Sequence, residues 1–430
     1  MCVGVIMQTC VRPVQPDVNE SGGTSATAAD RGRVRLNARL EGAWRTGWLP
    51  RPVLEPDVLI AAARARTGLN ALGDDSGWSD RLQILTQALH EEARLTSLGR
   101  VIAYGQLVAA LANRARMHAL WQRHMEILEH PIRAPIIILG QMRSGSTRMQ
   151  RLLARDARLA HTRFFESWNP VPARARRQAI DDRRLRGWIA LRVARWLNPD
   201  FDVIHPTATA EPDEEIGFHN IAVFGSAYEA QWRVPSFADA CETTDTRPVY
   251  AEFKRLLQTI AWLRREPGGR PWVLKLPQMT QDLGSVLATF PDARLVCLDR
   301  PAPALVASSA SLVHNQMRVQ SDAVDPHWIG REWLRKVALR QHRTSEARAR
   351  FGGPQVDVTF DEINEDWPAT MRKVYRTLGM PLLPEVETRM ARYLEQKRHR
   401  RLRSHLYSLE QFGLTEAQVE AVTGPTRFVR

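Results

Sequence analysis

A short apolar strand followed by a glycine-containing loop and a helix constrains this sequence more than any other feature. Residues 135–139 read Pro-Ile-Ile-Ile-Leu, a continuous apolar run rich in β-branched side chains. Such a run is typical of a central parallel strand that is covered on both faces. Gly140 ends the run, and residues 146–157 are predicted to form the helix that follows. This order of elements predicts a loop whose backbone N–H groups bind an anion at the start of the helix.

Further apolar runs predict additional strands of the same sheet. They cover residues 272–276, 294–298 and, more weakly, 355–360. Helical patterns lie between or after them, at residues 282–289, 302–313 and 333–350. Because strands alternate with helices, the sequence predicts an α/β fold with a central parallel sheet and helices on both sides.

The rest of the chain is divided into sections by changes of pattern. Residues 1–53 are weakly patterned, so we expect a flexible leader or a stretch upstream of the true start. Residues 54–133 show helical periodicity and predict an N-terminal helical section. Residues 134–424 then form the α/β domain, with a mostly helical insert at about residues 174–263 that we interpret as a cap.

Charge and cysteine usage exclude some classes of protein. The formal net charge is +13, but arginine is spread along the whole chain instead of being concentrated on one element. This spread argues against nucleic-acid binding. The four cysteines lack CxxC spacing, which argues against a disulfide framework or a zinc site and favours a reduced, cytoplasmic location. No apolar run approaches the roughly 20 residues that a membrane-spanning helix needs.

The loop at residues 140–147 differs from the GxxxxGK[ST] loop of nucleotide triphosphatases. Ser146 stands where that loop has the lysine that reaches the β- and γ-phosphates, and the nearest cation is Arg143. Asp299 is followed directly by Arg300, so the sequence offers no clear acidic strand end for Mg²⁺. A phosphotransferase or kinase is therefore disfavoured, although it stays open as a second enzyme class. A non-catalytic protein that uses the loop to bind a nucleotide also stays open, as does a loop that resembles an anion site by chance.

At this point the sequence resembles a known family. Residues 135–147 are similar to the 5′-phosphosulfate loop, PxxxxGxxRSG[ST]T, of sulfotransferases that use 3′-phosphoadenylyl sulfate (PAPS). Residues 272–277 resemble the second strand of that family, and residues 294–311 resemble its 3′-phosphate motif. Shorter stretches resemble the bacterial and tyrosylprotein-type branch, namely residues 165–170, 205–206, 214–215 and 404–414. The resemblance covers about residues 54–424 and implies a three-layer P-loop-like fold and PAPS-dependent sulfo transfer.

The resemblance also implies roles for individual side chains. Arg143 would hold the 5′-phosphate and assist catalysis, while Lys275 would meet the oxygen that bridges the sulfo group and the phosphate. Arg300 and Ser308 would bind the 3′-phosphate, and Arg398 is a candidate cation in a C-terminal loop that closes over the nucleotide. Further backbone and hydroxyl donors would come from Ser144, Gly145, Ser146 and Thr147. No divalent metal is required by this arrangement.

Each of these side chains also has a plainer structural interpretation. Lys275 could extend from a strand end to water. Arg300 could form a surface ion pair with Asp299. Ser308 could bond back to a carbonyl of its own helix. The occurrence of the three motifs together favours the functional interpretation.

The general base is less constrained. In the cytosolic branch a histidine lies two residues after the strand lysine, but this sequence has Pro277 there. In the tyrosylprotein-type branch the base is a glutamate about twenty residues after the loop arginine. Glu166 follows Arg143 by twenty-three residues and lies among aromatic residues, which would raise its pKa by desolvation. We therefore predict Glu166 as the base, although it could instead pair structurally with an arginine. The reserves are His205, Glu214, Glu215 and His314.

The tryptophans bear on the acceptor. The chain has thirteen, many of them within residues 168–272. They suggest an aromatic-lined cleft, although large aromatic side chains are more often core residues. Such a cleft would select a hydrophobic or ring-bearing alcohol, a lipid or a glycolipid. PAPS and this acceptor are the expected partners, and contact with a membrane surface and homo-oligomerisation stay open.

Overall fold

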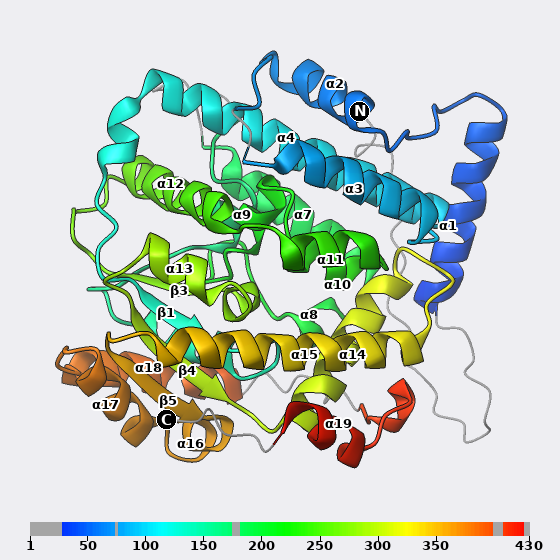
Figure 1. Cartoon of the computed structure of the whole chain (residues 1–430). Helices are drawn as coiled ribbons and strands as arrows, with labels where there is room; N and C mark the ends of the chain where they lie inside the picture. Colours follow the sequence, from blue (N-terminus) through cyan, green and yellow to red (C-terminus); the bar gives the residue numbers. More distant parts are fainter. Residues whose placement is uncertain (1–27, 74–75, 174–180, 399–406, 425–430) are drawn as a thin grey trace.

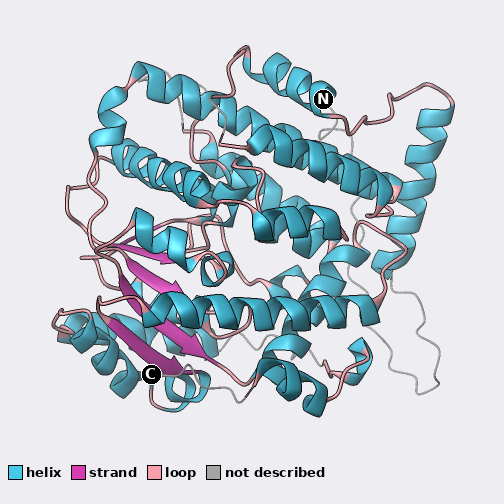
Figure 2. Cartoon of the chain, viewed as in Figure 1, coloured by secondary structure: helices cyan, strands magenta, loops and turns pink. Residues whose placement is uncertain are grey.

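A parallel sheet of five strands lies at the centre of the computed structural model, in the order β2-β3-β1-β4-β5 (Figures 1 and 2). The structure describes residues 28–73, 76–173, 181–398 and 407–424. The strands are β1 (Ile136–Leu139), β2 (Ala160–His161), β3 (Trp272–Lys275), β4 (Arg294–Asp299) and β5 (Gln355–Thr359). All neighbouring pairs are parallel, which confirms the predicted α/β fold with a central parallel sheet.

The sheet is covered on both faces because its side chains alternate between two apolar layers. Ile137 and Leu139 of β1 belong to one hydrophobic core, and Ile136 and Ile138 belong to the other. The first layer contains α12 (Arg247–Arg264) and α13 (Leu283–Thr289). The second contains α5 (Ser146–Leu153), α17 (Trp367–Thr377) and α18 (Pro384–Arg398). Figure 1 shows α12 and α13 on one side of the sheet and α17 and α18 on the other. The result is the expected three-layer arrangement.

The N-terminal helical section packs against part of the insert in a further hydrophobic core, separate from the two that cover the sheet. Its elements are α2 (Pro56–Thr67), α3 (Trp78–Glu91), α4 (Ser97–Arg123) and the 3-10 helix η2 (Met125–Glu129). The helices of the insert before α12 are α7 (Arg183–Leu197), α8 (Phe201–Ile204), α9 (Ile216–Ile221), α10 (Ser226–Gln231) and α11 (Pro235–Thr243). Leu85 of α3 and Leu111 of α4 share this core with Phe237 of α11.

The remaining elements complete the α/β part. They are α6 (Phe164–Trp168), η3 (Pro277–Thr280), α14 (Ala302–Arg318), α15 (Pro326–Ala349), α16 (Phe360–Glu365), η4 (Glu410–Phe412) and α19 (Glu416–Thr423). Among the helices that the structure describes, none combines the length and apolar character of a membrane span.

Two elements differ from the expectations. The first helix, α1 (Ala28–Arg45), lies within the section expected to be a flexible leader, whose residues 1–27 are outside the described part. Its Glu41 accepts a hydrogen bond from Ser97, and its Asn37 accepts one from the backbone of Leu98. These contacts with the start of α4 hold a helix whose own pattern is weak. Strand β2 was not predicted because its two residues are too short to form an apolar run.

Candidate active site

The order of the strands places Arg143, Lys275 and Arg300 at one edge of the sheet. Strand β1 lies between β3 and β4, and its Ile138 pairs with Lys275 of β3. Arg300 follows directly after β4. Because the carboxyl ends of parallel strands meet at the same edge, the loop after β1 lies between Lys275 and Arg300. The structure therefore brings the loop together with two motifs that follow it by more than a hundred residues in the sequence.

The loop after β1 has the geometry of an anion site. Arg143 and Gly145 both have positive φ angles, of 70° and 91°. This conformation costs a glycine little but strains an arginine, and such strain is typical of functional sites. The loop ends at Ser146, where α5 begins and its first N–H groups are available to an anion. The Ser144 hydroxyl is buried and has no hydrogen-bond partner among the described residues, so it is available to a ligand.

The predicted 3′-phosphate residues contact this loop directly. Nε of Arg143 donates to the Ser308 hydroxyl at 3.0 Å, and Nη1 of Arg300 donates to the backbone carbonyl of Arg143 at 2.7 Å. Arg300 also stacks on the ring of Phe360, with its Cζ 4.4 Å from the ring centroid. These contacts replace the surface ion pair with Asp299 that was the plainer interpretation of Arg300.

Tyr407 is an additional residue at this end of the site. Nη2 of Arg300 lies 3.4 Å from its hydroxyl. Burial acts to raise the pKa of the Tyr407 hydroxyl, but hydrogen bonds with Ser308 and Arg300 outweigh burial and lower it below its ordinary value. No role was predicted for Tyr407, although it lies within residues 404–414, one of the stretches that resemble a known family. Its role could not be inferred because the tail is far from the loop in sequence.

Lys275 is buried and paired, not extended to water. Its side chain is 3% exposed and forms an ion pair with Glu214. Its Nζ also lies 3.3 Å from the Thr147 hydroxyl of the loop. Glu215, which follows Glu214 in the chain, accepts a hydrogen bond from the backbone N–H of Lys275 at 2.9 Å. Burial raises the pKa of Glu215 to about 8, so its carboxyl group is largely protonated at neutral pH and adds little negative charge beside Lys275.

His205 and Asp213 form a hydrogen-bonded pair next to Lys275. Nε2 of His205 lies 3.2 Å from the Asp213 carboxylate, and Thr207 donates to the same carboxylate. Burial acts to lower the pKa of His205, but the charge and hydrogen bond of Asp213, together with the charge of Glu214, outweigh burial and raise that pKa above its ordinary value. Burial acts to raise the pKa of Asp213, whereas His205 and the hydrogen bonds to its carboxylate bring it to about 2.

These residues also form the one cluster in the described part of the chain that could hold a metal ion. The candidate ligand atoms of His205, Asp213 and Glu214 lie within 4.8 Å of one another. Glu214 is already neutralised by Lys275, and Asp213 is paired with His205. The arrangement can therefore hold and move a proton with these residues alone.

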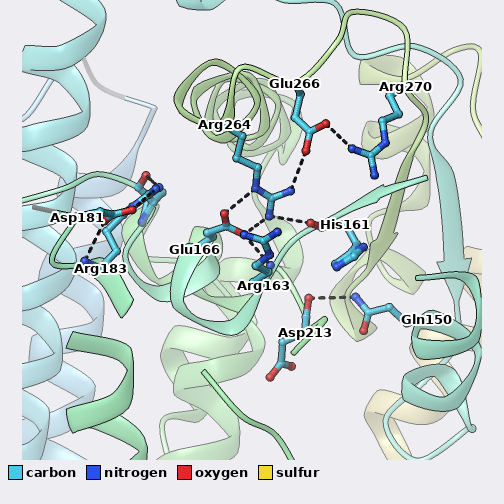
Figure 3. Close-up of polar contacts among 11 residues, drawn as sticks. Gln150, His161, Arg163, Glu166, Asp181, Arg183, Asp213, Arg264, Glu266 and Arg270 are labelled. Atoms are coloured by element: carbon cyan, nitrogen blue, oxygen red, sulfur yellow. Dashed lines mark hydrogen bonds and ion pairs between the residues drawn. The ribbon is translucent and has the colours of Figure 1, made fainter. Parts of the chain in front are cut away.

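Glu166, the predicted base, occupies a different environment. It is fully buried, and its carboxylate forms an ion pair with Arg264 of α12 in which Nε donates at 2.7 Å (Figure 3). Its second oxygen also accepts the backbone N–H of Arg163 at 3.0 Å, which caps α6. Both oxygens are therefore occupied, and Glu214 is the glutamate that contacts Lys275. The structure favours the plainer interpretation of Glu166, a glutamate paired with an arginine.

The remaining predicted residues are His314, Arg398 and the tryptophans. His314 packs against Phe412, with ring centroids 6.2 Å apart, and burial lowers its pKa. Arg398 is the last residue of α18, and its side chain lies outside the described part of the structure. Trp232 and Trp272 are buried in two different hydrophobic cores. Trp188 and Trp196 of α7 are exposed instead, so these four tryptophans do not gather in a single acceptor cleft.

The site combines a loop that can bind an anion with basic residues at the ends of the neighbouring strands. Such a site suits an enzyme that transfers an anionic group. Comparison with known proteins identifies that group, because a model of the sulfotransferase family matches residues 135–385. The chain belongs to the sulfotransferase family and is an enzyme that transfers a sulfo group.

Solved structures of sulfotransferases are similar over most of the chain. The sulfotransferase STF1 from Mycobacterium tuberculosis H37Rv is 28% identical, with a TM-score of 0.72, over 87% of this chain and 99% of that one. The sulfotransferase STF9 from Mycobacterium avium is 25% identical, with a TM-score of 0.75, over 86% of this chain and 95% of that one. Comparison with curated proteins finds no match.

Proposed function

We propose that this enzyme transfers the sulfo group of PAPS to the hydroxyl group of a hydrophobic alcohol and releases adenosine 3′,5′-bisphosphate (PAP). The observation that carries the proposal is the meeting of Arg143, Lys275 and Arg300 at one edge of the sheet. A donor with phosphate groups at both its 5′ and 3′ positions needs cations at two places, and these residues supply them. PAPS supplies an activated sulfo group on a phosphate leaving group.

The loop and the end of β4 would bind the nucleotide. The N–H groups from Gly145 to Thr147 and the Ser144 hydroxyl would bind the 5′-phosphosulfate. Arg300, Ser308 and Tyr407 would bind the 3′-phosphate, with Arg143 held between the two subsites by its contact with Ser308. Residues that already contact one another in this way need little rearrangement when the ligand binds.

Lys275 would stabilise the leaving group. Sulfo transfer breaks the bond between sulfur and the bridging oxygen and forms a bond between sulfur and the acceptor oxygen. By analogy with phosphoryl transfer, negative charge grows on the bridging oxygen in the transition state. The Lys275 ammonium is buried, so its electrostatic effect on that charge is larger than it would be in water. Glu214 would orient it until the donor binds.

His205 would take the proton of the acceptor hydroxyl. Asp213 orients the imidazole, as the carboxylate does in other histidine–carboxylate pairs that act as bases. The His205 side chain is 30% exposed, so an acceptor can reach it, whereas Glu166 is fully buried. A raised pKa makes His205 a stronger base once it is neutral. We therefore prefer His205 to Glu166 for this role.

The test is incubation of the purified enzyme with isotopically labelled PAPS and a cell extract that contains lipids. We expect label to be transferred to a hydrophobic alcohol that mass spectrometry identifies, with PAP as the second product. The Lys275→Ala variant serves as the matched control and should transfer at least tenfold less label. Turnover of ATP in the presence of Mg²⁺ without any response to PAPS would overturn the proposal.

A further inference from the structure

One face of α7 exposes large apolar side chains to solvent. Leu185, Trp188 and Trp196 are 59%, 51% and 55% exposed, and Arg192 is also exposed. Their spacing of three, four and four residues places all of them on one side of the helix. Exposed tryptophans are uncommon because each leaves a large apolar surface in water. A row of two tryptophans and a leucine on one helix face therefore indicates an interaction surface.

The rest of α7 is anchored next to the candidate active site. Gly187 and Leu191 are buried there. Nη2 of Arg195 donates to the backbone carbonyl of Thr207 at 2.8 Å, and the Thr207 hydroxyl donates to Asp213. The segment that carries the proposed base is therefore attached directly to α7, the helix that bears the exposed apolar side chains.

The charge of α7 complements an anionic surface. The helix contains five arginines and no acidic residue. Its Arg183, Arg186 and Arg195 pair with aspartates, as Figure 3 shows for Arg183 and Asp181. Arg184 and Arg192 are exposed, and no ion pair joins them to a carboxylate of the described residues. Arg192 instead lies over the ring of Trp188, with its Cζ 5.7 Å from the centroid.

The exposed surface continues onto α1. Nη1 of Arg33 donates to the backbone carbonyl of Leu197, the last residue of α7, at 3.3 Å. The neighbouring Val34 is 65% exposed, and Arg31 and Arg35 are exposed beside it. Two helices that are far apart in the sequence thus present the same combination of apolar and basic side chains at this junction.

We propose that the exposed face of α7 binds the surface of a membrane that contains anionic lipids. This face consists of Arg184, Leu185, Trp188, Arg192 and Trp196. Tryptophan favours the boundary between lipid headgroups and acyl chains, and arginine binds the phosphate groups there. This inference rests on the proposed function, since an enzyme held by α7 at the membrane would have access to alcohols embedded in it. The acceptor class that it indicates is therefore a membrane lipid with a free hydroxyl group.

The experiment is co-sedimentation of the full chain with phospholipid vesicles in the absence of PAPS. We compare vesicles of phosphatidylcholine alone with vesicles that contain about one-third phosphatidylserine. The wild-type protein should sediment with the anionic vesicles only, and rising salt should release it. The Arg184→Glu/Arg192→Glu and Trp188→Ala/Trp196→Ala variants should each bind the anionic vesicles at least roughly tenfold more weakly.

Trp48→Ala is the matched control, because Trp48 is 71% exposed but lies in the loop after α1, outside this surface. It should bind vesicles like the wild type. Failure of the wild-type protein to bind anionic vesicles, or equal binding by all variants, would overturn the inference. A stable dimer that the α7 variants dissociate would also count against it and would assign the surface to a second copy of the chain.

This outcome is separable from the test of the proposed function. Vesicle binding is measured without the donor, whereas sulfo transfer is measured with labelled PAPS and a cell extract. If the enzyme transfers the sulfo group but does not bind vesicles, only the membrane inference is overturned. If it binds vesicles but does not use PAPS, the membrane inference stands and the proposed donor is overturned.

Discussion

The guanidinium group of Arg300 donates a hydrogen bond across 2.7 Å to the backbone carbonyl of Arg143. This contact joins the end of β4 to the loop after β1 at the residue whose φ angle is 70°. Because that conformation is unfavourable for an arginine, contacts from neighbouring elements must hold it. The two proposed phosphate subsites are therefore connected, and a substitution in one of them should also change phosphate binding at the other.

Replacing Lys275 by alanine tests the role of the buried ammonium. We expect turnover to fall at least tenfold, because the charge on the leaving oxygen loses its nearest buried cation. The PAP affinity should change little, whereas the melting temperature should fall, because Glu214 loses its buried partner. Lys373, an exposed lysine that pairs with Glu362, provides the control variant Lys373→Ala, which should keep full activity. Unchanged turnover in Lys275→Ala would remove its assigned role.

The pH dependence of activity should report His205. Its pKa is raised by Asp213, and a base must be neutral, so kcat/KM should rise with pH through a midpoint above 6.5. In Asp213→Asn the carboxylate charge is lost, the pKa of His205 should fall, and the midpoint should move to lower pH. The plateau rate should fall as well, because the imidazole is less well oriented. A midpoint that does not move when Asp213 is replaced would exclude this pair as the proton acceptor.

Replacing Glu166 by glutamine distinguishes a structural residue from a base. Because Glu166 and Arg264 form a buried ion pair, we expect the free energy of unfolding to fall by about 3 kcal/mol. The pH profile of the remaining activity should keep its shape. The exposed Glu420 on α19 gives the control Glu420→Gln, which should leave stability unchanged. Abolished turnover in a protein of normal stability would restore Glu166 as the base.

The Tyr407 hydroxyl should contribute to PAP binding. In Tyr407→Phe the contact with Arg300 is lost, and we expect the Kd for PAP to rise about fivefold, in line with the loss of one hydrogen bond. Isothermal titration calorimetry measures this change. Tyr104→Phe, in the helical section and away from the site, should bind PAP like the wild type. Tighter binding by Tyr407→Phe would mean that the hydroxyl blocks the site instead.

Much of the fold could be predicted because its signals are local. The runs at 135–139, 272–276 and 294–298 correspond to β1, β3 and β4, which are largely apolar because they are buried on both faces. The weaker run at 355–360 corresponds to β5, an edge strand in which Val356 and Val358 are buried. Strand β2 and helix α1 could not be predicted in this way. Their positions depend on pairing with β3 and on contacts with the start of α4, which no local pattern records.

The partners of the charged residues could not be read from spacing. Glu166 has the spacing expected of a base, yet Arg264, almost a hundred residues later, occupies both of its oxygens. Glu214 pairs with Lys275, and His205 pairs with Asp213, because the insert folds back over the end of β3. The energy of such a pair depends on distance and burial in three dimensions.

The amino-acid sequence alone predicts the apolar strands, the loop with Arg143 and the basic residues at strand ends. Each of these features depends on side chains that are neighbours along the chain. The tertiary structure decided which carboxylate meets Lys275 and which side of α7 remains exposed. Those outcomes depend on contacts between distant segments, and folding alone brings those segments together.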